Sequence, residues 1–231
     1  MNVQSLFEQL LKSGMGAAGQ MGSQGRSSGL GKVAMGGVLG MLLGNRRGGG
    51  LGSSALKLGS VAAIGAMAYK AYQEYQSRQQ AQSPAAAAGA PLGRPGAFDA
   101  GNGFAALPAS QQEVHSRAML KALIAAAKSD GHLDARERGL VQDELHRMQA
   151  DAQTRAWVQA ELERPVEPEE VAAAAEGPEM AAEMYLASLL VVDQTSTMER
   201  AYLDALARSL KLAPELKADL EARAAAAAAA A

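Results

Sequence analysis

The chain has 231 residues and no cysteine, which excludes disulfides, thiolate metal sites and cysteine nucleophiles. Hydrophobic residues make up 48% of it but aromatic residues only 4%, and this alanine-, leucine- and methionine-rich composition favours helices over sheets. The formal net charge of −2 conceals a basic front, with eight Lys or Arg against two acids in residues 1–80, and an acidic remainder. This asymmetry suits contact of the front with anionic lipid and argues against nucleic acid as a partner.

The N-terminal residues predict a short amphipathic helix. Five apolar side chains recur at helical spacing within residues 2–12, namely Val3, Leu6, Phe7, Leu10 and Leu11. The glycine- and serine-rich stretch that follows, up to residue 29, is typical of a flexible linker. We therefore treat residues 1–29 as one unit, a helix followed by a linker.

Residues 30–75 form a glycine-rich apolar segment that we expect to associate with a membrane. Its two most apolar stretches are 30–44 and 51–69, separated by "NRRGGG". Gly36, Gly40 and Gly44 lie on one line of a helix, where they would let a second helix approach closely, so we expect helix packing and self-association there.

The length of these stretches leaves three arrangements open. A bilayer span needs about 20 apolar residues, whereas Lys32, Arg46 and Lys57 interrupt the segment. The segment could form a hairpin of two short helices, a single span over 51–69 with Lys57 reaching the surface, or a soluble self-association element.

The rear of the chain predicts an all-α bundle of about seven helices, over residues 110–231. An Ala-, Pro- and Gly-rich stretch at 76–109 precedes it and is expected to be a disordered linker. Ser110 and Glu113 have the spacing of a capping box. Further helix starts are indicated in chain order by Asp134 with Glu137, Asp151, Pro168, Pro178, Ser196 with Glu199, and Pro214.

Two segments of this bundle repeat each other. "AMLKALIAAAKSDGHLDARERGLVQDELHRM" and "AEMYLASLLVVDQTSTMERAYLDALARSLKL" both consist of an apolar helix, an Asp, a short polar turn, a Glu and another helix. Two such helical hairpins can pack together and bury a common face. The repeat therefore predicts a compact domain built on paired hairpins.

The element "KSDGHLDARE", followed one repeat later by "VVDQTSTMERAYLDALARSLKL", resembles the tellurite-resistance TerB-like helical domain. Together with the glycine-rich apolar front, the chain is similar to the YebE type of bacterial inner-membrane protein of unknown function. The resemblance implies an all-helical domain, a membrane anchor in the bacterial inner membrane and an acidic metal site. It implies no established enzymatic activity.

Carried over onto this sequence, the acidic metal site consists of Asp130, Asp134, Glu137, Asp193 and Glu199. Carboxylates are hard oxygen ligands of the kind that a divalent ion such as Ca²⁺ prefers, so two facing turns could pool enough of them. His132 could add a nitrogen ligand for a transition ion. The site would then hold a divalent metal ion as the one cofactor of the chain.

The same turn can also be explained without a metal. Asp130 can accept hydrogen bonds within its own turn, Gly131 can take the positive φ that ends a helix, and Asp134 with Glu137 can cap the next helix. Residue types alone do not choose between helix capping and metal binding.

We expect no enzyme, because no P-loop, "HExxH" motif or nucleophile elbow occurs in the chain. The first functional hypothesis is a membrane-tethered interaction or stress-response module whose helical domain faces the cytoplasm. The alternative is a divalent-metal-binding or metal-sensing domain. The expected partners are membrane lipid, a protein that the sequence does not identify, and a second copy of the chain.

Overall fold

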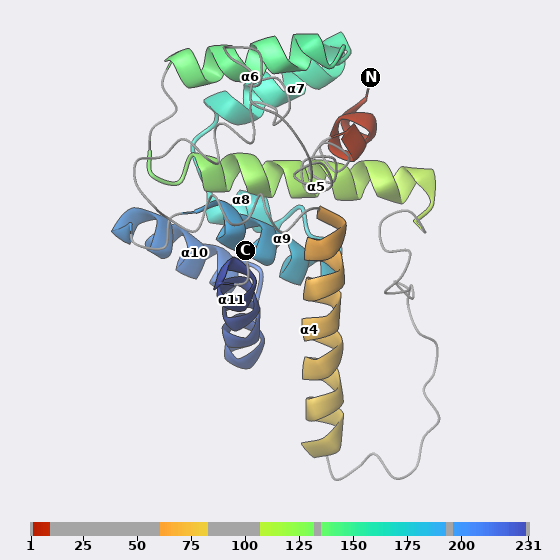
Figure 1. The fold of residues 1–231 in the computed structure, drawn as a ribbon, viewed down its shortest axis with the longest axis vertical. Helices are drawn as coiled ribbons and strands as arrows, with labels where there is room; N and C mark the ends of the chain where they lie inside the picture. Colours follow the sequence, from red (N-terminus) through yellow and green to blue (C-terminus); the bar gives the residue numbers. More distant parts are fainter. Residues whose placement is uncertain (1, 10–60, 83–106, 132–134, 193–195, 230–231) are drawn as a thin grey trace, which may run out of the picture.

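The computed structural model describes residues 2–9, 61–82, 107–131, 135–192 and 196–229. All regular secondary structure in these ranges is helical, which confirms the predicted all-α class (Figure 1). A short helix covers residues 3–9. The others are α4 (Val61–Gln82), α5 (Ala109–Ala127), α6 (Ala135–Arg147), α7 (Ala152–Glu163), α8 (Pro168–Ala172), α9 (Pro178–Val191), α10 (Thr197–Ser209) and α11 (Pro214–Ala229).

Helix α9 lies at the centre of the molecule. Ten consecutive residues of it, Met180 to Leu189, are buried, because a helix that is apolar on nearly every side must be covered on every side. It makes its most extensive contact with α5 and further contacts with α4, α10 and α11. Ser188 Oγ lies 3.5 Å from the carbonyl oxygen of Ala122, which shows how closely small side chains let α9 approach α5. The first helices of the two predicted hairpins therefore pack on each other.

The predicted helix starts are largely confirmed. Pro168, Pro178 and Pro214 stand at the beginning of α8, α9 and α11. Asp151 caps α7, since its Oδ1 accepts a hydrogen bond of 2.7 Å from the amide of Thr154. Within the described part of the chain, the rear region holds the seven helices α5 to α11, as predicted.

The capping box predicted at Ser110 and Glu113 is wrong. Helix α5 begins earlier, with Pro108 as its N-cap, and the carbonyl of Pro108 accepts hydrogen bonds from the amides of Gln111 and Gln112. Ser110 is therefore already inside the helix. The Glu113 carboxylate instead contacts Arg117 one turn later and the backbone amide of Gln4.

Helix α4 packs on the bundle, although we expected residues 30–75 to form a separate front segment. Ala68, Ala71 and Tyr72 are buried, and α4 contacts α9 and α11. Beyond this contact, α4 also covers residues 76–82, where a disordered linker was expected. That part of the linker prediction is wrong.

Hydrogen bonds between tyrosine and glutamine side chains one turn apart explain why the helix continues. Gln73 donates to the Tyr69 hydroxyl and Gln76 to the Tyr72 hydroxyl, each at 2.7 Å, and Gln79 donates to Tyr75. Pairs four residues apart on a helix stabilise it. Residues 76–82 precede the Pro- and Gly-rich part of the stretch on which the linker prediction rested, and the side-chain bonds support a helix there.

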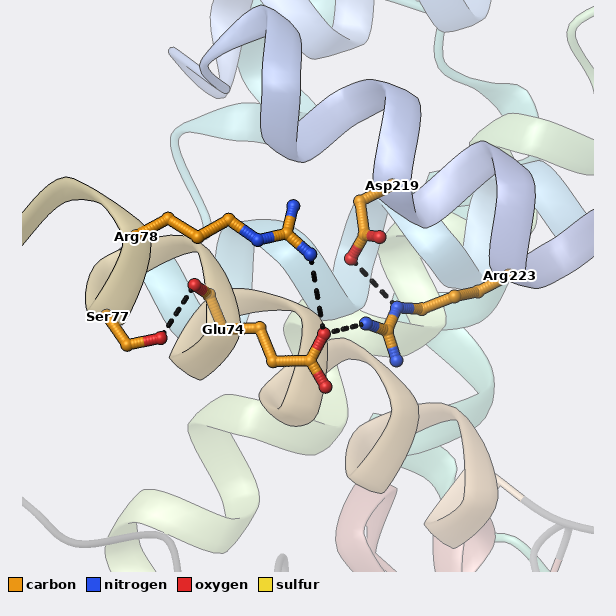
Figure 2. A network of polar contacts seen from close by, with 5 residues as sticks. All are labelled: Glu74, Ser77, Arg78, Asp219 and Arg223. Carbon is orange, nitrogen blue, oxygen red and sulfur yellow. Dashed lines mark hydrogen bonds and ion pairs between the residues drawn. The ribbon is translucent and has the colours of Figure 1, made fainter. Parts of the chain in front are cut away.

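An ionic cluster joins α4 to α11, the last helix of the chain that the structure describes (Figure 2). Arg223 places Nη2 2.6 Å from a Glu74 oxygen and Nε 2.8 Å from Asp219. Arg78 approaches the same Glu74 carboxylate at 3.8 Å. Glu74 on α4 and Asp219 on α11 therefore share one guanidinium, which fixes the position of α4 along the bundle.

The predicted N-terminal helix is present over residues 3–9, with Val3, Leu6 and Phe7 almost fully buried. Leu10 and Leu11 lie outside the described residues, as do Gly36, Gly40 and Gly44, so the predicted helix-packing line stays a prediction. Among the helices that the structure describes, none is long and apolar enough to cross a membrane. The predicted membrane segment is therefore not confirmed.

Because one face of α4 is packed on the bundle, the effect of a larger side chain on the free energy of unfolding should depend on its position in the helix. Ala68→Leu should lower the free energy of unfolding by about 1–3 kcal/mol, because position 68 is fully buried and overpacking strains its surroundings. The matched change Ala66→Leu, at an exposed position of the same helix, should alter it by less than about 0.5 kcal/mol. Urea denaturation of the full chain measures both, and equal effects would contradict the docking of α4.

Candidate functional site

The turn after α5 adopts the glycine conformation predicted for it. Gly131 has a φ of 83°, a backbone conformation that residues with a side chain rarely adopt, and its amide donates a 2.8 Å hydrogen bond to the carbonyl of Lys128. The chain therefore reverses at Gly131, directly after Asp130. This feature belongs to the capping interpretation of the turn.

The two predicted turns lie next to each other. A Cβ atom built on Gly131 would stand 3.8 Å from Met198 Cε, and Met198 immediately precedes Glu199 in α10. Ser196 Oγ accepts a hydrogen bond of 3.4 Å from the amide of Glu199, which confirms Ser196 as the N-cap of α10. Only 2% of the Glu199 surface is exposed. The repeat thus brings Gly131 and Met198, at the described ends of the two turns, into contact distance.

The metal prediction is not tested by this arrangement. Asp134 and Asp193 lie outside the described residues, as does His132, and the side chain of Glu137 is not described. Among the residues that are described, no group of three or more His, Asp or Glu could hold a metal ion. Asp130 and Glu199 are thus placed at neighbouring turns, and the remainder of the predicted ligand set stays a prediction.

A buried ionisable pair that the sequence reasoning missed lies at the centre of the fold. His115 Nε2 of α5 stands 3.0 Å from Glu183 Oε2 of α9, and the side chains are only 4% and 8% exposed. A carboxylate is costly to bury unless a partner neutralises it or donates hydrogen bonds to it. The histidine supplies such a contact, so the pair fixes how α5 and α9 are aligned.

Helix α4 covers this pair at a glycine. A Cβ atom built on Gly65 would meet Glu183 Oε1 at 3.4 Å, a tight contact. Position 65 therefore places the backbone of α4 directly beside the Glu183 carboxylate. Three helices from different parts of the chain, α4, α5 and α9, meet around Glu183.

Two sequence signals could have indicated the pair. Glu183 is an acidic residue inside the most apolar helix of the chain. His115 stands on the buried stripe of α5, in helical register with Met119 and Ala122. A charge within an apolar helix and a histidine on an apolar stripe each indicate a buried polar contact, but only the fold shows that they meet.

Other buried polar groups form hydrogen bonds between helices of the bundle. Lys128 Nζ donates a 2.8 Å hydrogen bond to the carbonyl of Glu161 and another to that of Arg164, closing the end of α7, and its burial lowers the pKa of the ammonium group. The Tyr185 hydroxyl donates to Glu221 at 2.8 Å, and burial raises the pKa of this phenol well above its usual value. These contacts fasten α5 to α7 and α9 to α11.

Comparison with known proteins finds a family match over most of the chain. The sequence matches, over residues 28–224, the family described as "Protein of unknown function (DUF533)". It is also 32% identical over 103 residues to a protein of Yersinia enterocolitica described as "Uncharacterized protein in ampR 5'region", a match that covers 45% of this chain and 74% of the relative. No solved structure matches significantly.

The buried pair predicts strong coupling between positions 115 and 183. Glu183→Met alone should lower the free energy of unfolding by about 3–5 kcal/mol, because His115 is then buried without its carboxylate partner. The double variant His115→Leu, Glu183→Met should lose far less, since two apolar side chains replace both polar ones. A double-mutant cycle by urea denaturation measures the coupling, and strictly additive losses would show that the two residues do not interact.

Proposed function

The chain belongs to DUF533, a TerB-like family of unknown function, and from this premise we propose that it is a non-enzymatic interaction module. In this proposal, the apolar front holds the molecule at the bacterial inner membrane, as in the YebE type. The helical bundle then presents its surface to a protein partner on the cytoplasmic side.

The observation that carries the proposal is the docking of α4 on the bundle. Helix α4 includes residues 61–75 of the glycine-rich apolar segment, and it is anchored to the bundle by Ala68 and Ala71 near its middle and by the Glu74–Arg223 contact slightly farther along. The front of the chain is thus connected to the bundle by a packed helix. A packed connection holds the bundle at a set orientation to whatever the front is attached to.

A module of this kind needs no reaction chemistry of its own. The buried ionisable contacts of the described residues join one helix to another: His115 with Glu183, and Lys128 with the end of α7. This use of the polar groups favours binding over catalysis as the role of the bundle. The partner would then be recognised by the outer faces of the helices.

The tether can be tested by fractionation of cells that express the full chain. We expect the protein in the membrane pellet after high-speed centrifugation, resistant to alkaline carbonate and released by detergent. In this proposal the part of the apolar 30–75 segment that precedes α4 enters the bilayer. A variant that lacks residues 30–57 should move to the supernatant with α4 intact. Full-length protein in the supernatant without detergent would refute the membrane part of the proposal.

A second function, divalent-metal binding, is favoured by the closeness of the two turns. Gly131 lies against Met198, so Asp130, which precedes Gly131, and Glu199, which follows Met198, belong to neighbouring turns. A Ca²⁺-like ion takes about six to eight oxygen ligands, and two neighbouring turns could supply them together. In this proposal Asp130, Asp134, Glu137, Asp193 and Glu199 are the ligands, and the ion would stabilise the end of the bundle.

Calorimetric titration of the full chain with Ca²⁺, Mn²⁺ and Zn²⁺ tests this second function. Saturable heat and a raised melting temperature are expected, because an ion that binds only the native state stabilises it. Asp130→Asn should weaken the binding, whereas Asp204→Asn, at the Lys217 contact in α10, should leave it unchanged. Absence of both heat and melting shift at millimolar ion would leave helix capping as the sole role of the turns.

A further inference from the structure

The helix at residues 3–9, drawn in red in Figure 1, is held in place by contacts with its own chain. Val3, Leu6 and Phe7 are almost fully buried, whereas Gln9 is exposed. So short a helix is marginal in water without tertiary contacts. Its order therefore comes from docking, and we call this helix the N-terminal strap.

Two side chains near the start of α5 bind the strap through hydrogen bonds. The backbone amide of Gln4 donates to Glu113 Oε2 at 3.1 Å, and Gln4 Nε2 donates to Gln112 Oε1 at 2.6 Å. Asn2 caps the strap, since its Oδ1 accepts a 2.9 Å hydrogen bond from the Ser5 amide. The strap is thus bound to α5 in a defined register.

The carboxylate of Glu113 connects the strap to α7. Its other oxygen, Oε1, accepts a 2.9 Å hydrogen bond from Arg117 Nε, one turn farther along α5. Cζ of Arg117 in turn lies 5.5 Å from the ring centroid of Trp157 in α7, within the range of a cation–π contact. Glu113 therefore accepts hydrogen bonds from the strap and from the arginine that contacts α7.

The strap can open while the bundle stays folded. Ordering its residues costs conformational entropy comparable in size to the stabilisation that comes from burying three apolar side chains. Terminal segments of this kind open locally at a much lower free energy than a core helix does. When the strap opens, Glu113 Oε2 loses its amide donor, and the carboxylate is free to rotate away from Arg117.

We propose that the N-terminal strap is a conformational switch that sets how firmly α7 is held on the bundle. With the strap docked, Glu113 keeps Arg117 over Trp157, and this contact fastens α7 to α5. With the strap open, the contact is lost, and Lys128 at the end of α7 still holds that helix, so α7 loosens without leaving the bundle. The switch requires neither a membrane nor a metal ion.

Hydrogen–deuterium exchange of the full chain tests the switch. Phe7→Ala removes a buried anchor of the strap and should speed exchange of the α7 amides about two- to fivefold, the effect of losing one partly exposed ion pair. The amides of α9 and α11 should exchange as before, because the core of the bundle is unchanged. Gln9→Ala, at an exposed position of the strap, is the matched control and should leave α7 unaffected.

A second variant tests the route by which the strap acts on α7. In a chain that already carries Arg117→Met, Phe7→Ala should have no further effect on α7, because the contact that transmits the state of the strap is missing. An undiminished effect in this background would show that the strap does not act through Arg117 and would overturn the proposal.

Two other outcomes of the exchange experiment also contradict the switch. If Phe7→Ala leaves exchange of the α7 amides unchanged, the strap does not control α7. If it speeds exchange of every helix equally, the strap belongs to the cooperative core and does not open by itself. The experiment is performed on detergent-solubilised protein, so its result does not depend on the membrane tether.

Discussion

The contact on which the fold depends is the one between Glu183 and His115. An acidic residue in the middle of an otherwise apolar helix can be buried only where a partner contacts it. His115, which lies on α5, is that partner, and its Nε2 stands 3.0 Å from Glu183 Oε2. This requirement fixes the rotation and the sliding position of α9 against α5. Hydrophobic packing alone would tolerate neighbouring registers, since alanines and leucines are interchangeable at many positions.

The Glu183 carboxylate also contacts α4, where the neighbouring side chains are small. Gly65 places the backbone of α4 beside Glu183, and Ala68 and Ala71 continue the contact with small side chains. Farther along the helix, Arg223 joins Glu74 to Asp219 (Figure 2). The apolar front of the chain is therefore connected to the bundle by a helix whose residues 65–74 contact α9 and α11.

Local signals predicted the helices and most of their starts. Pro168, Pro178 and Pro214, together with the caps at Asp151 and Ser196, determine helix ends through contacts within a few residues. The docking of α4 was not predicted, because its buried face consists of alanines and one tyrosine, and such a face has little periodic contrast. The contact between His115 and Glu183 could not be predicted from neighbouring residues in the sequence, because the two residues lie on different helices that only the tertiary fold brings together. The proposed metal ligands fall partly outside the described residues, and their prediction stands on the resemblance and on the closeness of the two turns.

Hydrogen–deuterium exchange on the full chain tests the central claim, that α4 is a packed part of the bundle, most directly. If α4 is fastened by the contacts described above, amides between residues 64 and 75 should be protected to a similar degree as those of α9 and should open together with them. Exchange of these amides within seconds, while α9 stays protected, would show that α4 is an independent helix and would contradict the account.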